Sequence, residues 1–177
     1  SGSPFHGLAL RDVSLPMAFV WQKGAKAWTF DGPRITPDAT LEWRQPLALS
    51  GEVKQVDDVR WVQTKDGRWL KSDELRIAAR PSVLPAVAKT GAKWIDISIF
   101  SQTMVLWEGE RPVYATLVST GRDGVGDPAK TLSTPQGTFR IYQKHVTTTM
   151  DSNAADKEFE LRDVPWVMYF KGGYALH

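Results

Sequence analysis

Short segments in which apolar and polar residues alternate recur along most of the chain, and this pattern predicts strands rather than helices. The clearest case is VRWVQTKDGRWLKS, residues 59–72, in which aromatic and β-branched residues flank Asp66 and Gly67. An Asp-Gly dipeptide suits the positive φ angles of a tight turn between two strands. We therefore predict a β-hairpin centred on these two residues.

Other segments of the first half have the same character. Residues 17–30 predict two short strands around Gly24, and residues 45–56 predict another pair bent near Gly51. Four or five short strands at this spacing are typical of a small barrel or sandwich. We therefore predict a small β module over residues 1–80.

The next segment, RIAARPSVLPAVAKTGAK, has a different composition. Pro81 and Pro85 lie among small residues, which indicates a linker over residues 81–92 that holds at most a short helical turn. After it, three strands are predicted by alternation, at residues 94–100, 104–107 and 113–119.

The remaining residues are less regular. Residues 120–130 are rich in glycine and predict a loop, while Pro135 and Gly137 predict a turn leading into a strand over residues 138–142. Residues 146–162 are polar and irregular, and we predict a long loop there, of the kind that often forms a lid.

Composition limits the possible functions. The 177 residues are 42% apolar, with 22 Lys and Arg against 20 Asp and Glu, so the chain lacks the basic surface that nucleic-acid binding needs. No apolar run approaches the roughly 18 residues of a membrane span. The chain contains no cysteine, and its three histidines are far apart, so we expect no metal site and no cofactor.

Tryptophan is concentrated in the first module. Five of the eight Trp lie before Arg80: Trp21, Trp28, Trp43, Trp61 and Trp69. Exposed rings of this kind can stack on sugar or peptide ligands. The interpretation we favour is that the large rings fill the thin core of a small β module.

The second half resembles a known family. WIDISIFSQTMVLWEGERPVYATLVSTGRDG, STPQGTFRI, MDS and VPWVMYFKGGYALH follow one another in the order found in the first two-thirds of the L,D-transpeptidase catalytic domain, the YkuD type. The resemblance covers residues 93–177. Its most specific elements are Thr-Pro-x-Gly-x-Phe at residues 134–139 and a His that follows an apolar strand, His177.

This resemblance implies cysteine acyl transfer on peptidoglycan stem peptides, in the periplasm or cell envelope of a bacterium. In such enzymes a Cys in a downstream Ser/Thr-His-Gly-Cys element attacks the peptide bond, and the position of His177 corresponds to the base. A thiol with a pKa near 8.5 is only a few per cent thiolate at neutral pH, so it needs an imidazole to take its proton. Tyr174 and Met150 fall where similar proteins have groove and lid residues. For Tyr174 the alternative is a place in the core, and Met150 is expected to cap the groove by packing. His145 is a further candidate that could face the substrate groove and meet a stem-peptide carboxylate, and its alternative is a solvated strand end.

The chain departs from the family pattern because it has no Cys element. We therefore expect residues 93–177 to be an incomplete L,D-transpeptidase β-sandwich, preceded by a bacterial SH3-like β-barrel, and we expect this chain alone to be inactive. Its expected partners are peptidoglycan stem peptides and either the C-terminal remainder of the catalytic domain or a second chain. The alternatives are a non-catalytic wall-binding protein with a degenerate transpeptidase-like half, and a structural or regulatory β protein.

Overall fold

The computed structural model describes residues 5–11, 14–152 and 159–177, and the side chains of residues 149–152 and 159–163 lie outside that description. The chain divides into two compact units, residues 1–125 and 126–177. Strands dominate both units, which confirms the prediction of a mainly β protein. The linker predicted at residues 81–92 falls inside the first unit, and the sequence-based division into domains stays a prediction.

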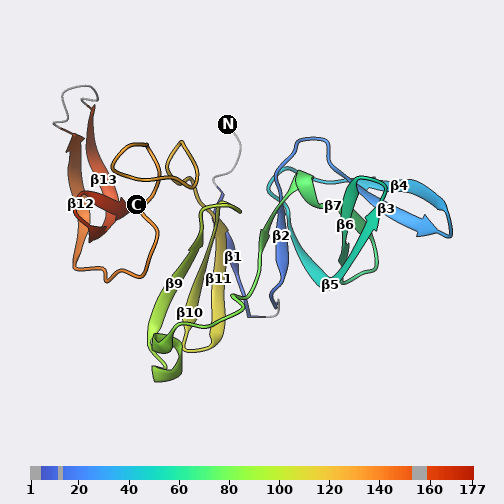
Figure 1. Ribbon diagram of the computed structural model, residues 1–177, viewed down its shortest axis with the longest axis horizontal. Helices are drawn as coiled ribbons and strands as arrows, with labels where there is room; N and C mark the ends of the chain where they lie inside the picture. Colours follow the sequence, from blue (N-terminus) through green and yellow to red (C-terminus); the bar gives the residue numbers. More distant parts are fainter. Residues whose placement is uncertain (1–4, 12–13, 153–158) are drawn as a thin grey trace. The chain divides into compact units, whose positions relative to one another are not determined.

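Seven strands of the first unit form one sheet in the order β4-β3-β7-β6-β5-β2-β8 (Figure 1). They are β2 (Met17–Val20), β3 (Lys26–Asp31), β4 (Arg34–Thr40), β5 (Pro46–Val56), β6 (Val59–Thr64), β7 (Trp69–Lys71) and β8 (Leu75–Ala78), with a 3-10 turn, η1 (Ser72–Glu74), between the last two. β4 and β8 end this order, so the described strands do not close into a barrel. The SH3-like assignment of this module stays a prediction.

The hairpin predicted at Asp66 and Gly67 is confirmed. β6 and β7 pair on either side of it, and Gly67 has a φ of +90°. The Thr64 amide donates to the Arg68 carbonyl at 2.8 Å, and the Arg68 guanidinium lies 2.6 Å from the Asp66 carboxylate. Hydrogen bonds from the Arg68 guanidinium and the Thr64 hydroxyl to the Asp66 carboxylate hold the pKa of Asp66 down to about 2. The turn is therefore fixed by side chains as well as by glycine.

Two expectations for the first module need correction. The pair of strands expected near Gly51 is one strand, β5, with an irregular register between Leu49 and Val53. Gly51 has a φ of +97°, so its polar neighbourhood forms a bulge within the strand rather than a turn. β2 and β3 exist as predicted around Gly24, but each pairs with other strands and not with its neighbour.

A second sheet of the first unit has the order β1-β11-β10-β9. Its strands are β1 (Leu8–Ala9), β9 (Lys93–Ser98), β10 (Thr103–Glu108) and β11 (Arg111–Leu117). The three consecutive strands confirm the meander expected from alternation, and η2 (Ala86–Thr90) is the short helical turn expected in the linker. β1 was not expected, because a two-residue strand pairing with residues more than a hundred positions away leaves no local pattern.

The first unit contains two hydrophobic clusters. One lies within the seven-stranded sheet: Ala18, Val20, Ala25, Ala27, Leu41, Leu47, Leu49, Val62, Leu70 and Leu75. The other joins the two sheets: Leu10, Met17, Phe19, Ala78, Val105, Trp107 and Ala115. The second cluster includes residues on both sides of the predicted linker, so the two sheets share buried side chains.

The tryptophans of the first module divide between the two interpretations. Trp61 and Trp69 are buried and Trp28 is half-buried, in an edge-to-face contact with Trp61 at 5.8 Å, as core filling predicts. Trp21 and Trp43 are exposed.

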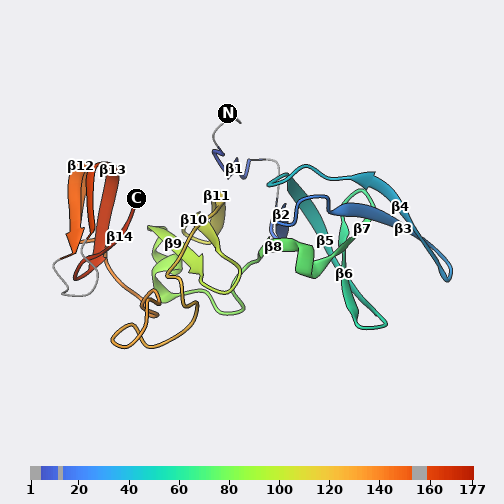
Figure 2. The same cartoon turned by 90° about the horizontal axis from the view of Figure 1, so that it is seen from above.

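The second unit is built on a three-stranded sheet, β12-β13-β14 (Figure 2). Its strands are β12 (Gln143–Ser152), β13 (Phe159–Lys171) and β14 (Tyr174–Leu176). The strand predicted at residues 138–142 is wrong, since those residues are irregular. The loop predicted over residues 146–162 is also wrong for the parts that lie in β12 and β13. Antiparallel pairing satisfies their backbone groups, and threonine suits strands even where no apolar face alternates.

Candidate active site

His177 lies next to a short hairpin at the end of the second unit. β13 and β14 pair on either side of Gly172, which has a φ of +51° and permits the reversal. The phenol of Tyr142 donates to the Gly172 carbonyl at 2.6 Å and ties the preceding segment to this turn. His177 directly follows Leu176, which pairs with Met168, and its side chain is exposed.

The register relates His177 to the second histidine of this unit. His145 of β12 pairs with Val167 of β13, and Val167 is fully buried. Extending the β13-β14 register by one residue sets His177 beside the same Val167, from the opposite side of the middle strand. Two strand spacings of roughly 4.8 Å then separate the two backbones, with the side chains on one face. The His145 ring also packs edge-on against Tyr169, at 5.8 Å between centroids.

The Thr-Pro-x-Gly-x-Phe element contacts the same hairpin through its aromatic residue. The Phe139 ring lies 5.4 Å from that of Phe170, which in turn lies 6.3 Å from Tyr174. Gly137 has a φ of +133°, and a Cβ added there would come within 3.3 Å of the Phe139 ring. A glycine at this position therefore lets the chain turn tightly under its own phenylalanine.

The predicted site residues are thus only partly brought together. Tyr174 joins the Phe139 and Phe170 rings, whereas His145 contacts Tyr169, so the described contacts do not connect Tyr174 with His145. The side chain of Met150 lies outside the described part of the structure. The assignment of these residues and of His177 to a catalytic groove stays a prediction.

The chemical groups near the hairpin are few. The 177 residues contain no cysteine, so the imidazole of His177 has no thiol partner within them. Among the described residues, no group of three or more His, Asp or Glu is placed to hold a metal ion. The hairpin carries an exposed histidine and a cluster of aromatic rings.

The helical segments of the described residues are all too short to span a bilayer.

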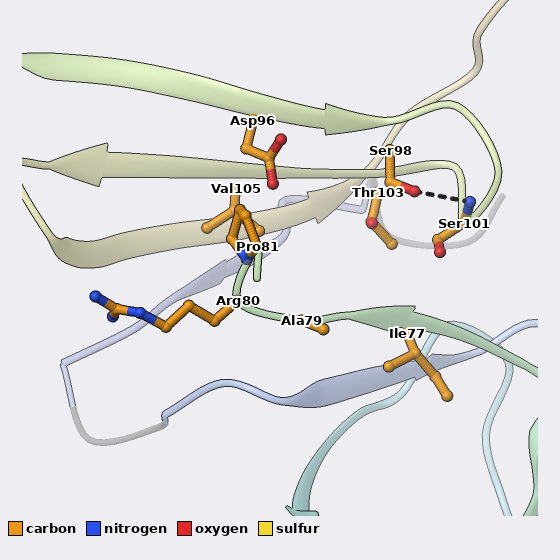
Figure 3. A pocket seen from close by; sticks show the side chains of 9 residues that line it. All are labelled: Ile77, Ala79, Arg80, Pro81, Asp96, Ser98, Ser101, Thr103 and Val105. Atoms are coloured by element: carbon orange, nitrogen blue, oxygen red, sulfur yellow. Dashed lines mark hydrogen bonds between the residues drawn. The ribbon is translucent and has the colours of Figure 1, made fainter. Parts of the chain in front are cut away.

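Sequence reasoning missed one ionisable group in the first unit. Asp96 of β9 pairs with Val105 of β10, and Val105 is buried in the cluster that joins the two sheets. Asp96 is half-buried, and burial raises the pKa of its carboxyl group. It lines a cavity of about 250 Å³ (Figure 3). Asp96 could have been identified from the sequence as an acidic residue at an inward-facing position of a strand in which apolar and polar residues alternate.

Comparison with known families identifies the second half of the chain. Residues 92–177 match the family model YkuD, described as the L,D-transpeptidase catalytic domain. Searches of curated proteins and of solved structures found no match. Residues 92–177 therefore belong to the L,D-transpeptidase catalytic-domain family, as their motifs predicted.

Proposed function

We propose that this protein is part of a peptidoglycan L,D-transpeptidase of the bacterial cell envelope, in which His177 acts as the general base. The observation that carries the proposal is the family match over residues 92–177 together with the position of His177 beside the β13-β14 hairpin. The reaction is cysteine acyl transfer on a stem peptide, and the thiol comes from outside these 177 residues.

The exposure of His177 is compatible with this role. An imidazole that must reach a thiol, and later return the proton to a leaving amine, needs an accessible ring nitrogen. Tyr174 and the Phe139 and Phe170 rings form an apolar cluster on the same hairpin, which suits the methylene chain of a stem-peptide diamino acid. His145 flanks the same buried Val167 and is proposed to bind substrate rather than to move a proton.

The test compares two proteins. The 177-residue chain, mixed with a carbapenem, is expected to keep its intact mass, because it has no cysteine to acylate. The protein made from the natural reading frame that contains these residues is expected to gain one adduct.

His177→Ala in the longer protein should slow acylation by about 10²- to 10⁴-fold, the usual contribution of a general base. The matched control is His6→Ala, since His6 lies in the first unit. An adduct on the 177-residue chain, or acylation that is unchanged in His177→Ala, would contradict the proposal.

A second candidate function is supported by the missing thiol and by the exposed rings of Trp21 and Trp43. In it, the protein binds the wall without turning over stem peptides. The whole chain should then sediment with purified peptidoglycan, and Trp43→Ala should reduce the bound fraction. Lack of sedimentation would remove this candidate. An adduct on the longer protein would show that the site is catalytic.

A further inference from the structure

The cavity beside Asp96 lies within the first unit, between β8 with the residues that follow it and the strand pair β9-β10. β8 and the start of the linker form one wall with Ile77, Ala79 and Pro81 (Figure 3). β9 and β10 form the other wall with Asp96 and Val105. The space is about 250 Å³, and the proposed acyl transfer does not use it.

The Asp96 carboxylate faces this cavity without a partner. Among the residues that the structure describes, nothing forms a hydrogen bond or an ion pair with it. Removing a carboxylate from water without such a partner is unfavourable. Burial alone raises its pKa, and no neighbouring cation lowers it. A cationic group that entered the cavity would supply the missing interaction.

The nearest cations of the first unit are engaged elsewhere. Arg80 lines the same cavity, but its guanidinium donates to the Glu110 carbonyl at 3.0 Å and lies 3.7 Å from the Glu110 carboxylate. Its side chain points away from Asp96 (Figure 3). Lys93, on the same strand as Asp96, lies 3.6 Å from Glu108. These arrangements leave the Asp96 side of the cavity accessible to a cation from outside the unit.

Hydroxyl groups complete the polar side of the cavity. Ser98, Ser101 and Thr103 line it close to Asp96, and the Ser98 hydroxyl accepts a hydrogen bond from the Ser101 amide at 3.1 Å. Thr103 is 3% exposed, so neighbouring side chains enclose most of it. A carboxylate and hydroxyls on one side, with apolar side chains opposite, match a group that has hydrogen-bond donors at its tip and methylenes behind it.

We propose that this cavity binds a primary alkylammonium group, of the kind that ends the side chain of lysine or another diamino acid. The three N–H donors of the ammonium group bond to Asp96 and to the neighbouring hydroxyls. Its methylenes pack against Ile77, Pro81 and Val105. An Arg guanidinium is wider and planar, and it suits a bidentate site that a single half-buried carboxylate does not provide.

An adjoining cavity adds a preference for a carboxylate on the same ligand. Ile77 and Ser101 line both cavities, and the second, of about 470 Å³, is also lined by Arg60, Arg76 and Asp73. The Nε atom of Arg76 is buried without a hydrogen-bond partner in the described residues, and the guanidinium lies 4.8 Å from the Trp21 ring. Two arginines against one aspartate favour a negatively charged group here.

The test is an NMR titration of the whole chain with Nα-acetyl-lysine, which carries an ε-ammonium group and a free carboxylate. Shifts are expected at β8, β9 and β10. Nα,Nε-diacetyl-lysine, whose side-chain nitrogen is neutral, should not bind. This ligand pair tests the proposal without any substitution, so a variant that failed to fold would not decide it.

Two substitutions locate the site. Asp96→Asn should weaken Nα-acetyl-lysine by about tenfold or more, the usual effect of losing a charge-assisted hydrogen bond, whereas the exposed Asp58→Asn should change nothing. Arg76→Gln should weaken Nα-acetyl-lysine but leave Nα-acetyl-lysine amide unaffected.

Equal binding of the charged and neutral ligands, or undiminished binding to Asp96→Asn, would overturn the ammonium site. Equal effects of Arg76→Gln on the acid and the amide would overturn the carboxylate preference. The titration measures binding without turnover, so its outcome is independent of the acyl-transfer proposal.

Discussion

The two units differ in how they use their aromatic residues. In the first, Trp107 is 1% exposed and Phe19 fully buried, and both belong to a cluster that joins two sheets. In the second, the rings of Phe139, Tyr169 and Phe170 are half-buried around a short hairpin, where Phe139 contacts Phe170 and Tyr169 contacts Tyr142. The described part of the second unit has few fully buried side chains, among them Val167 and Ser133.

The two units therefore differ in how much their side chains contribute to the stability of the fold. The buried clusters of the first unit supply apolar area removed from water, which is the main favourable contribution to folding. The second unit leaves its rings and His145 half-buried and His177 exposed, and it has few fully buried side chains in its described part. Regions with few buried contacts open at lower free energy than a packed core does.

The largest expected effect follows from removing the ring at the centre of the joining cluster. Trp107→Ala should lower the free energy of unfolding of the first unit by about 3–5 kcal/mol, the usual cost of truncating a buried aromatic residue. Urea unfolding followed by circular dichroism measures it. Trp43→Ala, at an exposed ring, is the control and should cost much less. Similar losses in the two variants would show that burial in the joining cluster does not set the cost of removing the ring.

A smaller effect is expected in the second unit. Val167→Ala should lower stability by about 2 kcal/mol, because it removes most of a fully buried side chain between the two histidines. Hydrogen exchange should show faster opening of β12, β13 and β14, with protection in β10 unchanged. If β10 lost protection as well, the two units would fold as one, and the contrast between them would fail.

Asp96→Asn should act in the opposite direction. Burial raises the pKa of this carboxyl group, so the charged form is disfavoured in the folded state at neutral pH. Replacing it with a neutral side chain should raise Tm at pH 7 by at most a few degrees. The gain should shrink as the pH falls through the raised pKa of the folded protein and vanish below about 4, where aspartate is protonated in the unfolded chain as well. A loss of Tm at pH 7 would mean that Asp96 has a stabilising partner.

The smallest effect concerns the hairpin at Asp66. Its pKa is lowered to about 2, chiefly by hydrogen bonds from Arg68 and Thr64. A lowered carboxyl pKa stabilises the fold above the unfolded-state value of about 3.9, and that contribution disappears as the pH falls through about 2. Because the pair is largely exposed, Asp66→Asn should cost less than about 1 kcal/mol at pH 7 and nothing below pH 2. An equal loss at both pH values would assign the effect to turn geometry instead.

The sequence predicted best what depends on neighbours along the chain. The Asp66-Gly67 hairpin and the three strands of the meander follow from turn chemistry and alternation, and both are present. β12 and β13 were missed because their polar residues do not alternate, although pairing with each other satisfies the backbone.

The candidate site was predictable only in part, because some of its contacts depend on strand pairing that no local pattern in the sequence reveals. The family motifs marked His177 and the segment containing Phe139, but the ring contacts that link Phe139 to Tyr174 depend on the register of the β13-β14 hairpin. Asp96 was overlooked because its environment comes from β8 and the linker, which no pattern within β9 reveals.

Because of the two-residue strand β1, the chain enters the four-stranded sheet first, leaves it for the seven-stranded sheet and then returns. The chain pairs with β11 at Leu8 and Ala9, then builds the seven-stranded sheet, and only afterwards returns to form β9 and β10. Gly7 lies directly against the Tyr114 ring of β11, where any larger residue would clash. A pulling force applied at the N-terminus therefore reaches the β1-β11 hydrogen bonds before any strand of the seven-stranded sheet. Such a force would separate β1 from β11 first, before it loads the larger sheet.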